Sequence, residues 1–259
     1  MARLGAWSFE TATGVDIGDG APDAAEVNDA IATSLFNATI TQLVQLAFGD
    51  ESTAIGSRPG SGTVAKTLQR ALLTPERLVT YDGTDDTVLW DDVSTAGVTE
   101  TRHERIARAA LQGIATLRDT LGDDVSQWTW GKLHTVRLTS LVPDISGTSP
   151  VDVPPADDPA FPGGFPRPGD NFGVDASNFG MWSTGNFTFG SGPVQRMVVE
   201  MTPDGPRAWN AIPGGQSFDP ESPHHADEAE HWRRNNAPPL YFTDDDIDAH
   251  MESRVTFMP

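Results

Sequence analysis

Helical spacing of apolar residues dominates the first half of the chain. One series recurs every four residues, at Val27, Ile31 and Leu35. Asp23 and Glu26 precede this series with the spacing of a capping box, in which two side chains satisfy backbone N–H groups at a helix start. We therefore expect a helix that begins after Asp23 and ends at Gly49-Asp50.

Two more helices are predicted in this half. One follows a loop rich in glycine, serine and proline at residues 56–62 and covers residues 64–73. The other begins after Thr101, which repeats the capping-box spacing with Glu104, and ends at Gly122. Its apolar positions lie on one helical face: Ile106, Ala110, Ile114, Leu117 and Leu121.

Strand patterns begin in the second half. Residues 134–142 have the aliphatic and β-branched content of a strand that ends at Pro143. Residues 143–193 are rich in proline, glycine and aspartate, which indicates a loop. This loop also carries seven aromatic residues, at Phe161, Phe165, Phe172, Phe179, Trp182, Phe187 and Phe189. We therefore expect it to pack against the rest of the protein.

A β-hairpin and two short helices are predicted to complete the chain. The turn signal Pro203-Asp204-Gly205 separates two strand-like segments, residues 194–201 and 207–212. The first helix is expected at residues 223–234. The second is expected at residues 244–254, capped by Thr243, with acidic residues in the first turn where the helix dipole favours them.

Helices followed by strands and further helices indicate an α+β layered fold. We assign residues 1–124 to a mainly helical segment, and residues 125–259 to a strand-rich segment with C-terminal helices of the same domain. No run of about eighteen apolar residues is present, so we expect no membrane-spanning helix. Residues 1–7 lack the apolar stretch of a secretion signal, and the compartment stays open.

The charge balance restricts the partners. There are 37 acidic and 17 basic residues, which gives a net charge of −20. Such a surface repels nucleic acid, so we expect no nucleic-acid partner. Few of the cations are lysines, namely Lys66 and Lys132. This composition suits a protein from a high-salt environment or an acidic secreted protein from a GC-rich genome, and the two readings remain open. The absence of cysteine excludes disulfides and thiolate catalysis.

A catalytic nucleophile is not evident in the sequence. The segment Gly215-Gln216-Ser217-Phe218-Asp219 comes nearest to a Gly-x-Ser-x-Gly elbow, but Asp219 stands where the second glycine is needed. We interpret it as a structural turn. An N-terminal nucleophile requires Ser, Thr or Cys with a free α-amine, whereas the sequence starts with Met1-Ala2. We therefore expect no catalytic residue in this chain.

Two kinds of metal site were considered. Three ligand-type side chains fall at i, i+3 and i+7 of a predicted helix, with three more nearby: His224, Asp227 and His231, then His225, Glu228 and Glu230. Acidic clusters could supply calcium ligands at Asp16, Asp19 and Asp23, at Asp82, Asp85 and Asp86, and from Asp244 to Asp248. None has the spacing of a helix–loop–helix calcium site. We interpret both sets as solvated acidic surface and expect no metal site.

Trp128 and Trp130 lie two positions apart and would share one face of an extended segment. We interpret both as core anchors, because large aromatic side chains bury most of their surface in folded proteins. A platform that stacks against sugars is the alternative, because residues 143–193 are rich in aromatic side chains.

Four ordered stretches carry a resemblance to a known family, at Trp128–His134, Gly192–Val199, Pro213–Asp227 and Phe242–His250. In this order and spacing they resemble the closing part of the catalytic subunit of penicillin acylases, which are N-terminal-nucleophile amidases. Residues from Leu4 onward fit the preceding region less specifically. Two departures concern local packing: Phe218-Asp219 replaces a small pair, and His225 stands where a tyrosine is common.

The resemblance implies a four-layer αββα sandwich of which this chain forms part. It also implies amide hydrolysis through an acyl-enzyme, with an N-terminal serine as nucleophile, its α-amine as base and an asparagine that binds the oxyanion. These groups and the family's calcium ligands belong to earlier segments. Asn235-Asn236 lies in the wrong place and context to be that asparagine. Implied substrates are penicillins, acyl-homoserine lactones or lipopeptides, and members are commonly periplasmic or secreted.

Two functional hypotheses follow. In the first, the chain is the C-terminal part of an acylase β chain and serves as scaffold without a nucleophile or cofactor of its own. Its partner would be the acylase chain that carries the serine and the asparagine. The present chain would be a truncation, a processing product or a subunit of a split enzyme. In the second, the chain is a stand-alone acidic binding module for carbohydrate or calcium that uses the aromatic loops at residues 143–193.

Overall fold

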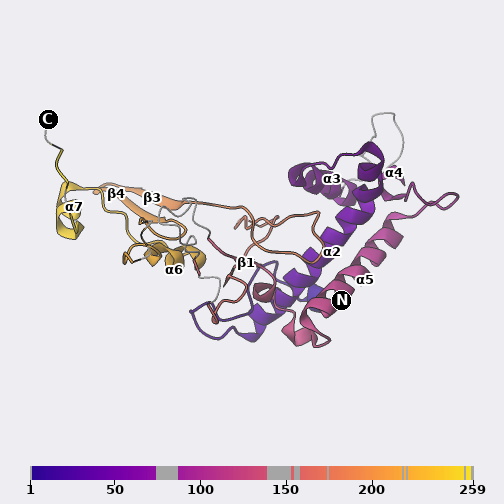
Figure 1. The fold of residues 1–259 in the computed structure, drawn as a ribbon, viewed down its shortest axis with the longest axis horizontal. Helices are drawn as coiled ribbons and strands as arrows, with labels where there is room; N and C mark the ends of the chain where they lie inside the picture. Colours follow the sequence, from indigo (N-terminus) through magenta and orange to yellow (C-terminus); the bar gives the residue numbers. More distant parts are fainter. Residues whose placement is uncertain are drawn as a thin grey trace. The chain divides into compact units, whose positions relative to one another are not determined.

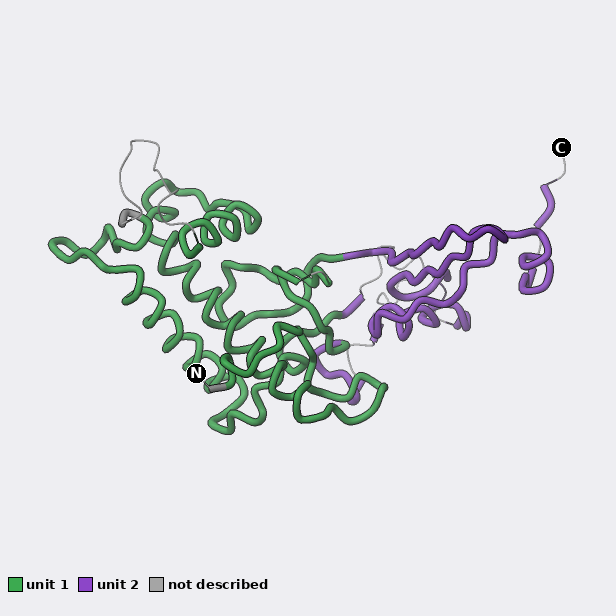
Figure 2. Tube along the Cα trace, turned by 180° about the vertical axis from the view of Figure 1, so that it is seen from behind, with its two compact units in different colours: residues 1–136, 165–192 green, residues 137–164, 193–259 purple. Residues whose placement is uncertain are grey.

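The computed structural model describes residues 2–73, 87–138, 153–154, 158–173, 175–217, 219, 221–253 and 255–257. The chain forms two compact units (Figure 2). Unit 1 contains residues 1–136 and 165–192, and unit 2 contains residues 137–164 and 193–259. Both helices and strands are present, which confirms the α+β class.

Unit 1 is built on two long helices that lie side by side, α2 (Ala24–Ile55) and α5 (Arg102–Leu121) (Figure 1). Asp23 caps α2 in a complete capping box with Glu26. Thr101 and Glu104 form the same arrangement at the start of α5, which ends at Gly122. The predicted starts of both helices and the end of α5 are therefore confirmed.

The predicted end of the first helix at Gly49-Asp50 is wrong. Helix α2 continues to Ile55 and ends at Gly56, whose left-handed φ of 66° suits a residue without a side chain. A glycine inside a helix costs only about 1 kcal/mol. Gly49 is therefore tolerated inside α2, and Ser52 in the following turn is buried.

Helix α2 also meets the length and composition criteria of a membrane-spanning helix, with 61% of its most apolar window buried inside the structure. A core helix passes the same criteria. Its buried residues include Ile31, Leu43 and Val44, which pack into the two apolar clusters of unit 1. In this structure α2 therefore acts as a core helix.

Gly113 sets the distance between α2 and α5. A Cβ atom at this position would lie 2.9 Å from the backbone of Ala38 and Thr39. We expect Gly113→Ala to lower the free energy of unfolding by about 1–3 kcal/mol, because the added methyl group forces the helices apart. Gly62→Ala is the matched control: it lies in a helix with open space around it and should stabilise by about 0.5–1 kcal/mol. Urea unfolding of both variants measures the difference, and equal effects would contradict this account.

The other elements of unit 1 are short. They are α1 (Ala2–Gly5), α3 (Ser61–Leu73), α4 (Thr87–Trp90), two 3-10 turns (Val125–Gln127 and Trp130–Lys132), β1 (Thr135–Val136) and β2 (Phe165–Pro166). Strands β1 and β2 pair antiparallel. Helix α3 confirms the helix predicted at residues 64–73 and begins three positions earlier. The strand predicted at residues 134–142 is reduced to β1 and a single bridge at Leu138, and residues 139–142 lie outside the described residues.

The described irregular chain between residues 165 and 192 packs onto these helices, as predicted from its aromatic content. Phe165, Phe179 and Phe187 are buried, and Met181 joins the cluster around α2. Phe172 stays exposed. The described part of the loop is thus a packed layer of unit 1 and not a linker.

Unit 2 contains the predicted hairpin, with β3 (Arg196–Thr202) and β4 (Gly205–Ala211) paired antiparallel through a two-residue turn at Pro203-Asp204. Two helices follow, α6 (Asp227–Arg233) and α7 (Asp244–His250). Thr243 caps α7 as predicted. The start predicted for α6 at residue 223 is wrong, since the segment before Asp227 forms turns, in which the Ser222 N–H donates to Asp219 and the His225 N–H to Ser222.

Candidate functional site

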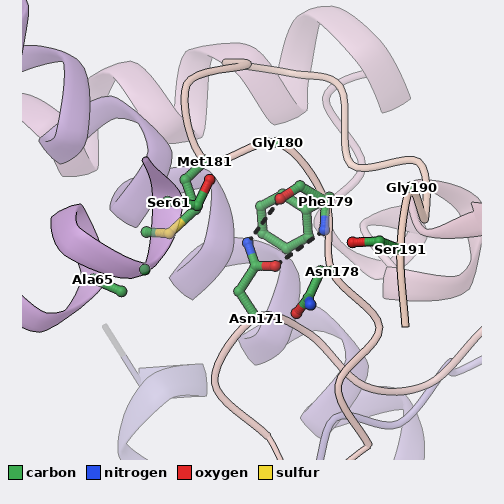
Figure 3. A pocket seen from close by; sticks show the side chains of 10 residues that line it. Ser61, Ala65, Asn171, Asn178, Phe179, Gly180, Met181, Gly190 and Ser191 are labelled. Atoms are coloured by element: carbon green, nitrogen blue, oxygen red, sulfur yellow. Dashed lines mark hydrogen bonds between the residues drawn. The ribbon is translucent and has the colours of Figure 1, made fainter. Parts of the chain in front are cut away.

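A pocket of about 400 Å³ opens in unit 1 between the start of α3 and the loop at residues 171–191 (Figure 3). Helix α3 contributes Ser61 and Ala65 to its wall. Asn171 holds the opposite wall in place, because its side chain donates to the carbonyl of Phe179 and accepts from the N–H of Phe179, both at 3.0 Å. The pocket is therefore built on a hydrogen-bonded loop.

The lining of this pocket limits its chemistry. Hydroxyl and amide groups come from Ser61, Asn178 and Ser191, and apolar surface comes from Phe179 and Met181. The described residues that line it include no carboxylate, histidine, lysine or arginine. The described lining therefore offers a ligand hydrogen-bonding groups and apolar surface but no charged side chain.

His134 lies at the centre of unit 1 and is fully buried. Its ring stacks on Trp130 at 4.7 Å between centroids, and Nδ1 lies 2.6 Å from the carbonyl oxygen of Phe187. Nδ1 must donate this bond because a carbonyl oxygen only accepts. Nε2 makes no hydrogen bond to any described residue. Burial lowers the pKa of His134 from 6.5 to about 4, so this imidazole is neutral near pH 7.

Because His134 is buried in its neutral form, we expect the free energy of unfolding to fall in acid. Its folded-state pKa lies below its unfolded value, so protonation favours the unfolded chain. The contribution of neutral His134 to the free energy of unfolding is present in full above about pH 6.5 and is lost as the pH falls toward 4. Between pH 7 and pH 5 the free energy of unfolding should fall by about 2 kcal/mol. Unfolding measured at several pH values should show this loss, and His134→Gln should show a flatter profile. Identical profiles for the two proteins would contradict the prediction.

Arg167 and Asp170 form a second set of buried polar contacts in unit 1. Arg167 donates to the carboxylate of Asp175 at 2.8 Å. Asp170 accepts from Asn37 of α2 at 3.2 Å and from the N–H groups of Phe172 and Gly173 at 2.7 Å. The contact between Asp170 and Asn37 ties the loop to α2, and the other contacts hold the loop itself together by charge-assisted hydrogen bonds. They serve structure, since each charged group is engaged by a neighbour in the same unit.

Buried acidic groups also occur near the end of α2. Burial and a hydrogen bond to Asp50 raise the pKa of Glu51 to about 8. Arg105 of α5 donates to the carbonyl of Trp90 at 2.7 Å and lies 3.6 Å from Asp92. This arrangement ties α4 and the following loop to the two long helices.

The Gly-Gln-Ser segment of unit 2 has the geometry of a turn. The Ser217 N–H donates to the carbonyl of His224 at 3.0 Å, and the Ser217 hydroxyl accepts from the Asp219 N–H at 3.1 Å. A Cβ atom on Gly215 would lie 2.1 Å from the carbonyl oxygen of His224, so only glycine fits. Ser217 thus stabilises its own loop. No serine hydroxyl of the described residues is hydrogen-bonded to a histidine ring.

The histidine face considered as a metal site does not form. Because α6 begins at Asp227, His224 precedes the helix and cannot share a helical face with His231. Both ring nitrogens of His224 are engaged, Nδ1 by Asp227 at 2.8 Å and Nε2 by Glu252 at 2.9 Å. The hydrogen bond to Asp227 is the larger cause and the contact with Glu252 the smaller one, and together they raise the pKa of His224 to about 8. A protonated imidazole between two carboxylates has no lone pair for a metal.

The acidic clusters have local structural roles. Asp16 accepts from the N–H groups of Gly18 and Gly20, and Asp23 caps α2. Asp244, Asp245 and Asp246 form the first turn of α7. The cluster at Asp82, Asp85 and Asp86 lies outside the described residues. Across the described part of the chain, no group of three His, Asp or Glu side chains is placed to hold a metal ion.

The two tryptophans are core anchors, as interpreted. Both lie in one apolar cluster with Phe179 and Leu117. Trp128 donates its indole N–H to Gly122, and Trp130 donates to Gly169, each at 2.8 Å. Because both rings are buried, they offer no platform for a sugar.

The chain belongs to the penicillin amidase family, whose model matches residues 1–249. Curated relatives are acyl-homoserine lactone acylases QuiP. The protein of Pseudomonas aeruginosa is 27% identical over 68% of this chain and 21% of its own length. The protein of Pseudomonas syringae pv. syringae is 32% identical over 59% of this chain and 17% of its own length. The chain thus spans about a fifth of the length of the curated relatives it matches.

A solved structure also matches, the thermostable penicillin G acylase from Alcaligenes faecalis. It is 16% identical, with a TM-score of 0.46, over 89% of this chain and 38% of that chain. The resemblance to penicillin acylases stated from the four sequence stretches is confirmed by the family match.

Proposed function

We propose that this chain forms the C-terminal part of the catalytic subunit of a penicillin-amidase-type acylase, with an N-terminal-nucleophile mechanism. The observation that carries the proposal is the family match over residues 1–249. The chain's coverage of only about a fifth of its relatives supports a share in a larger enzyme. The reaction is hydrolysis of a linear amide, which releases an acyl group from an amine.

In this proposal the chain supplies scaffold, and the nucleophile lies in the remaining polypeptide. Two observations support this division. The Ser217 hydroxyl accepts a hydrogen bond within its own turn, and the described wall of the pocket between α3 and residues 171–191 carries no ionisable side chain. The chain would then contribute strands and outer helices to a four-layer αββα sandwich. Acyl-homoserine lactones are the first substrates to test, because the curated relatives are named for them.

The test is amide hydrolysis by the complete acylase polypeptide to which this chain belongs. We expect release of homoserine lactone from an N-acyl-homoserine lactone, or of the free amine from penicillin G. The isolated 259-residue chain at equal concentration is the control and should show no turnover. Turnover by the isolated chain would contradict the scaffold role, and no turnover by the complete polypeptide would contradict the activity.

A further inference from the structure

The pairing of β3 with β4 determines which backbone N–H and C=O groups of β3 point toward its outer edge, away from β4. In this register Met197 lies opposite Asn210, and Val199 lies opposite Ala208. The Asn210 N–H donates to Pro238 and the Ala208 carbonyl accepts from Leu240, so both β4 residues direct their backbone groups away from β3. In an antiparallel pair of strands, two residues that lie opposite each other either both direct their N–H and C=O groups toward the partner strand or both direct them away from it. Met197 and Val199 therefore direct their N–H and C=O groups outward.

Met201 does the same, since backbone direction alternates along a strand. Its opposite residue, Pro206, has no N–H to offer. The two edges of the hairpin thus differ. The β4 edge is covered by residues 238–240, whereas on the β3 edge no backbone hydrogen bond of residues 197–201 to another described segment is seen.

One face of β3 is apolar, and the other face carries a single apolar residue, Val198, among polar ones. Met197, Val199 and Met201 lie on one face and are 55%, 49% and 79% exposed, and Val198 on the other face is 62% exposed. An exposed row of large apolar side chains on one strand face is typical of a surface that another segment covers. Edge strands that stay free usually carry lysine, proline or a bulge, and β3 carries only Glu200 as a charge within its outward-facing stretch. Its free edge and its exposed apolar face are therefore those of a strand that pairs with a further segment.

We propose that the outer edge of β3 receives a strand from the remaining acylase polypeptide, which extends the hairpin into a larger sheet. This inference rests on the proposed function. The added strand would be extended, would pair with Met197, Val199 and Met201, and would carry apolar side chains at alternating positions. A second copy of the chain fits this edge less well, because each copy carries a net charge of −20 and the two repel.

Amide hydrogen exchange at single-residue resolution tests the pairing. In the isolated chain, the amides of Met197, Val199 and Met201 should exchange quickly, while those of Val198 and Glu200, bonded to β4, exchange slowly. In the complete acylase, the three outward amides should slow by about a hundredfold or more. Unchanged exchange at these three amides in an active complete acylase would overturn the proposal.

Proline at position 199 gives a matched variant. Val199→Pro removes an outward N–H but no hydrogen bond to β4, because Val199 belongs to a non-hydrogen-bonded pair. We expect at least about tenfold less assembled acylase from Val199→Pro than from Val199→Ala, which keeps the N–H. Slow exchange at Val198 and Glu200 in the variant verifies that the hairpin is intact. Equal assembly of the two variants would overturn the proposal.

The remaining outcomes separate this proposal from the proposed function. Slow exchange at Met197, Val199 and Met201 in a complete polypeptide without amidase activity would uphold the pairing and refute the activity. Protection of the same amides in the isolated chain that increases with its concentration would assign the edge to a second copy, and would overturn the strand from the acylase. Such protection should be sought at low and at high salt, since salt screens the repulsion between copies.

Discussion

Replacement of Trp130 by alanine is expected to lower the free energy of unfolding by about 4 kcal/mol. The indole ring is fully buried and packs against His134, Phe179 and Phe187, with centroid distances between 4.7 and 5.8 Å. Its N–H donates to the carbonyl of Gly169. The substitution therefore opens a cavity and removes the partner of a buried carbonyl group, two effects that add.

Two controls make the Trp130 prediction specific. Trp130→Phe keeps most of the ring volume and loses the hydrogen bond, so we expect a smaller loss of about 1–3 kcal/mol. Leu111→Ala changes an exposed side chain of α5, and we expect less than about 0.5 kcal/mol. Urea unfolding followed by far-UV circular dichroism measures all three. A loss at Trp130→Ala no larger than that at Leu111→Ala would show that Trp130 is not a core anchor.

Replacement of Arg167 by methionine should have a comparable effect, of about 3–5 kcal/mol. The guanidinium group is fully buried and donates to Asp175, which is mostly buried. The substitution would leave this carboxylate without its cationic partner in a site of low polarity.

The exposed pair of Arg118 and Asp123 is the matched control for Arg167. It has a similar N–O distance of 3.0 Å but lies in solvent. We expect Arg118→Met to cost less than about 1 kcal/mol, because water and salt screen exposed ion pairs. If the substitutions at Arg118 and Arg167 had equal effects, burial of the Arg167 pair would not be the cause of its contribution.

Local signals predicted the helical framework correctly. The capping boxes at Asp23 and Thr101 and the stop at Gly122 depend on neighbouring residues, so the sequence alone determines them. The hairpin turn at Pro203-Asp204 is local in the same sense. The end of α2 was misplaced because a glycine inside a helix costs little, whereas Gly56 supplies the left-handed conformation that ends the helix.

The candidate sites were less predictable because they depend on helix boundaries and on contacts between residues distant in sequence. The metal hypothesis assumed that α6 begins at residue 223, and its start at Asp227 removes His224 from the helical face. Glu252, which engages His224, lies 28 positions away and no local pattern indicates it. The turn at Ser217 was interpreted correctly because a missing glycine is visible in the sequence.

The buried polar groups of unit 1 were not anticipated. Arg167 and Asp170 lie in a segment rich in glycine and proline, whose pattern indicates a loop. Asn37, which donates to Asp170, lies inside the apolar helix α2. A polar residue amid the apolar positions of α2 was the one available signal. Asn37 and Asp170 are 133 residues apart, so spacing along the chain cannot reveal their contact.

The most direct test of the scaffold role is the position of the reactive serine in the active acylase. Incubation of the complete, active polypeptide with phenylmethylsulfonyl fluoride, followed by digestion and mass spectrometry, identifies the labelled residue. We predict that loss of amidase activity parallels labelling of a serine outside residues 1–259. Labelling of Ser217, or of any other serine of this chain in proportion to the loss of activity, would contradict the account.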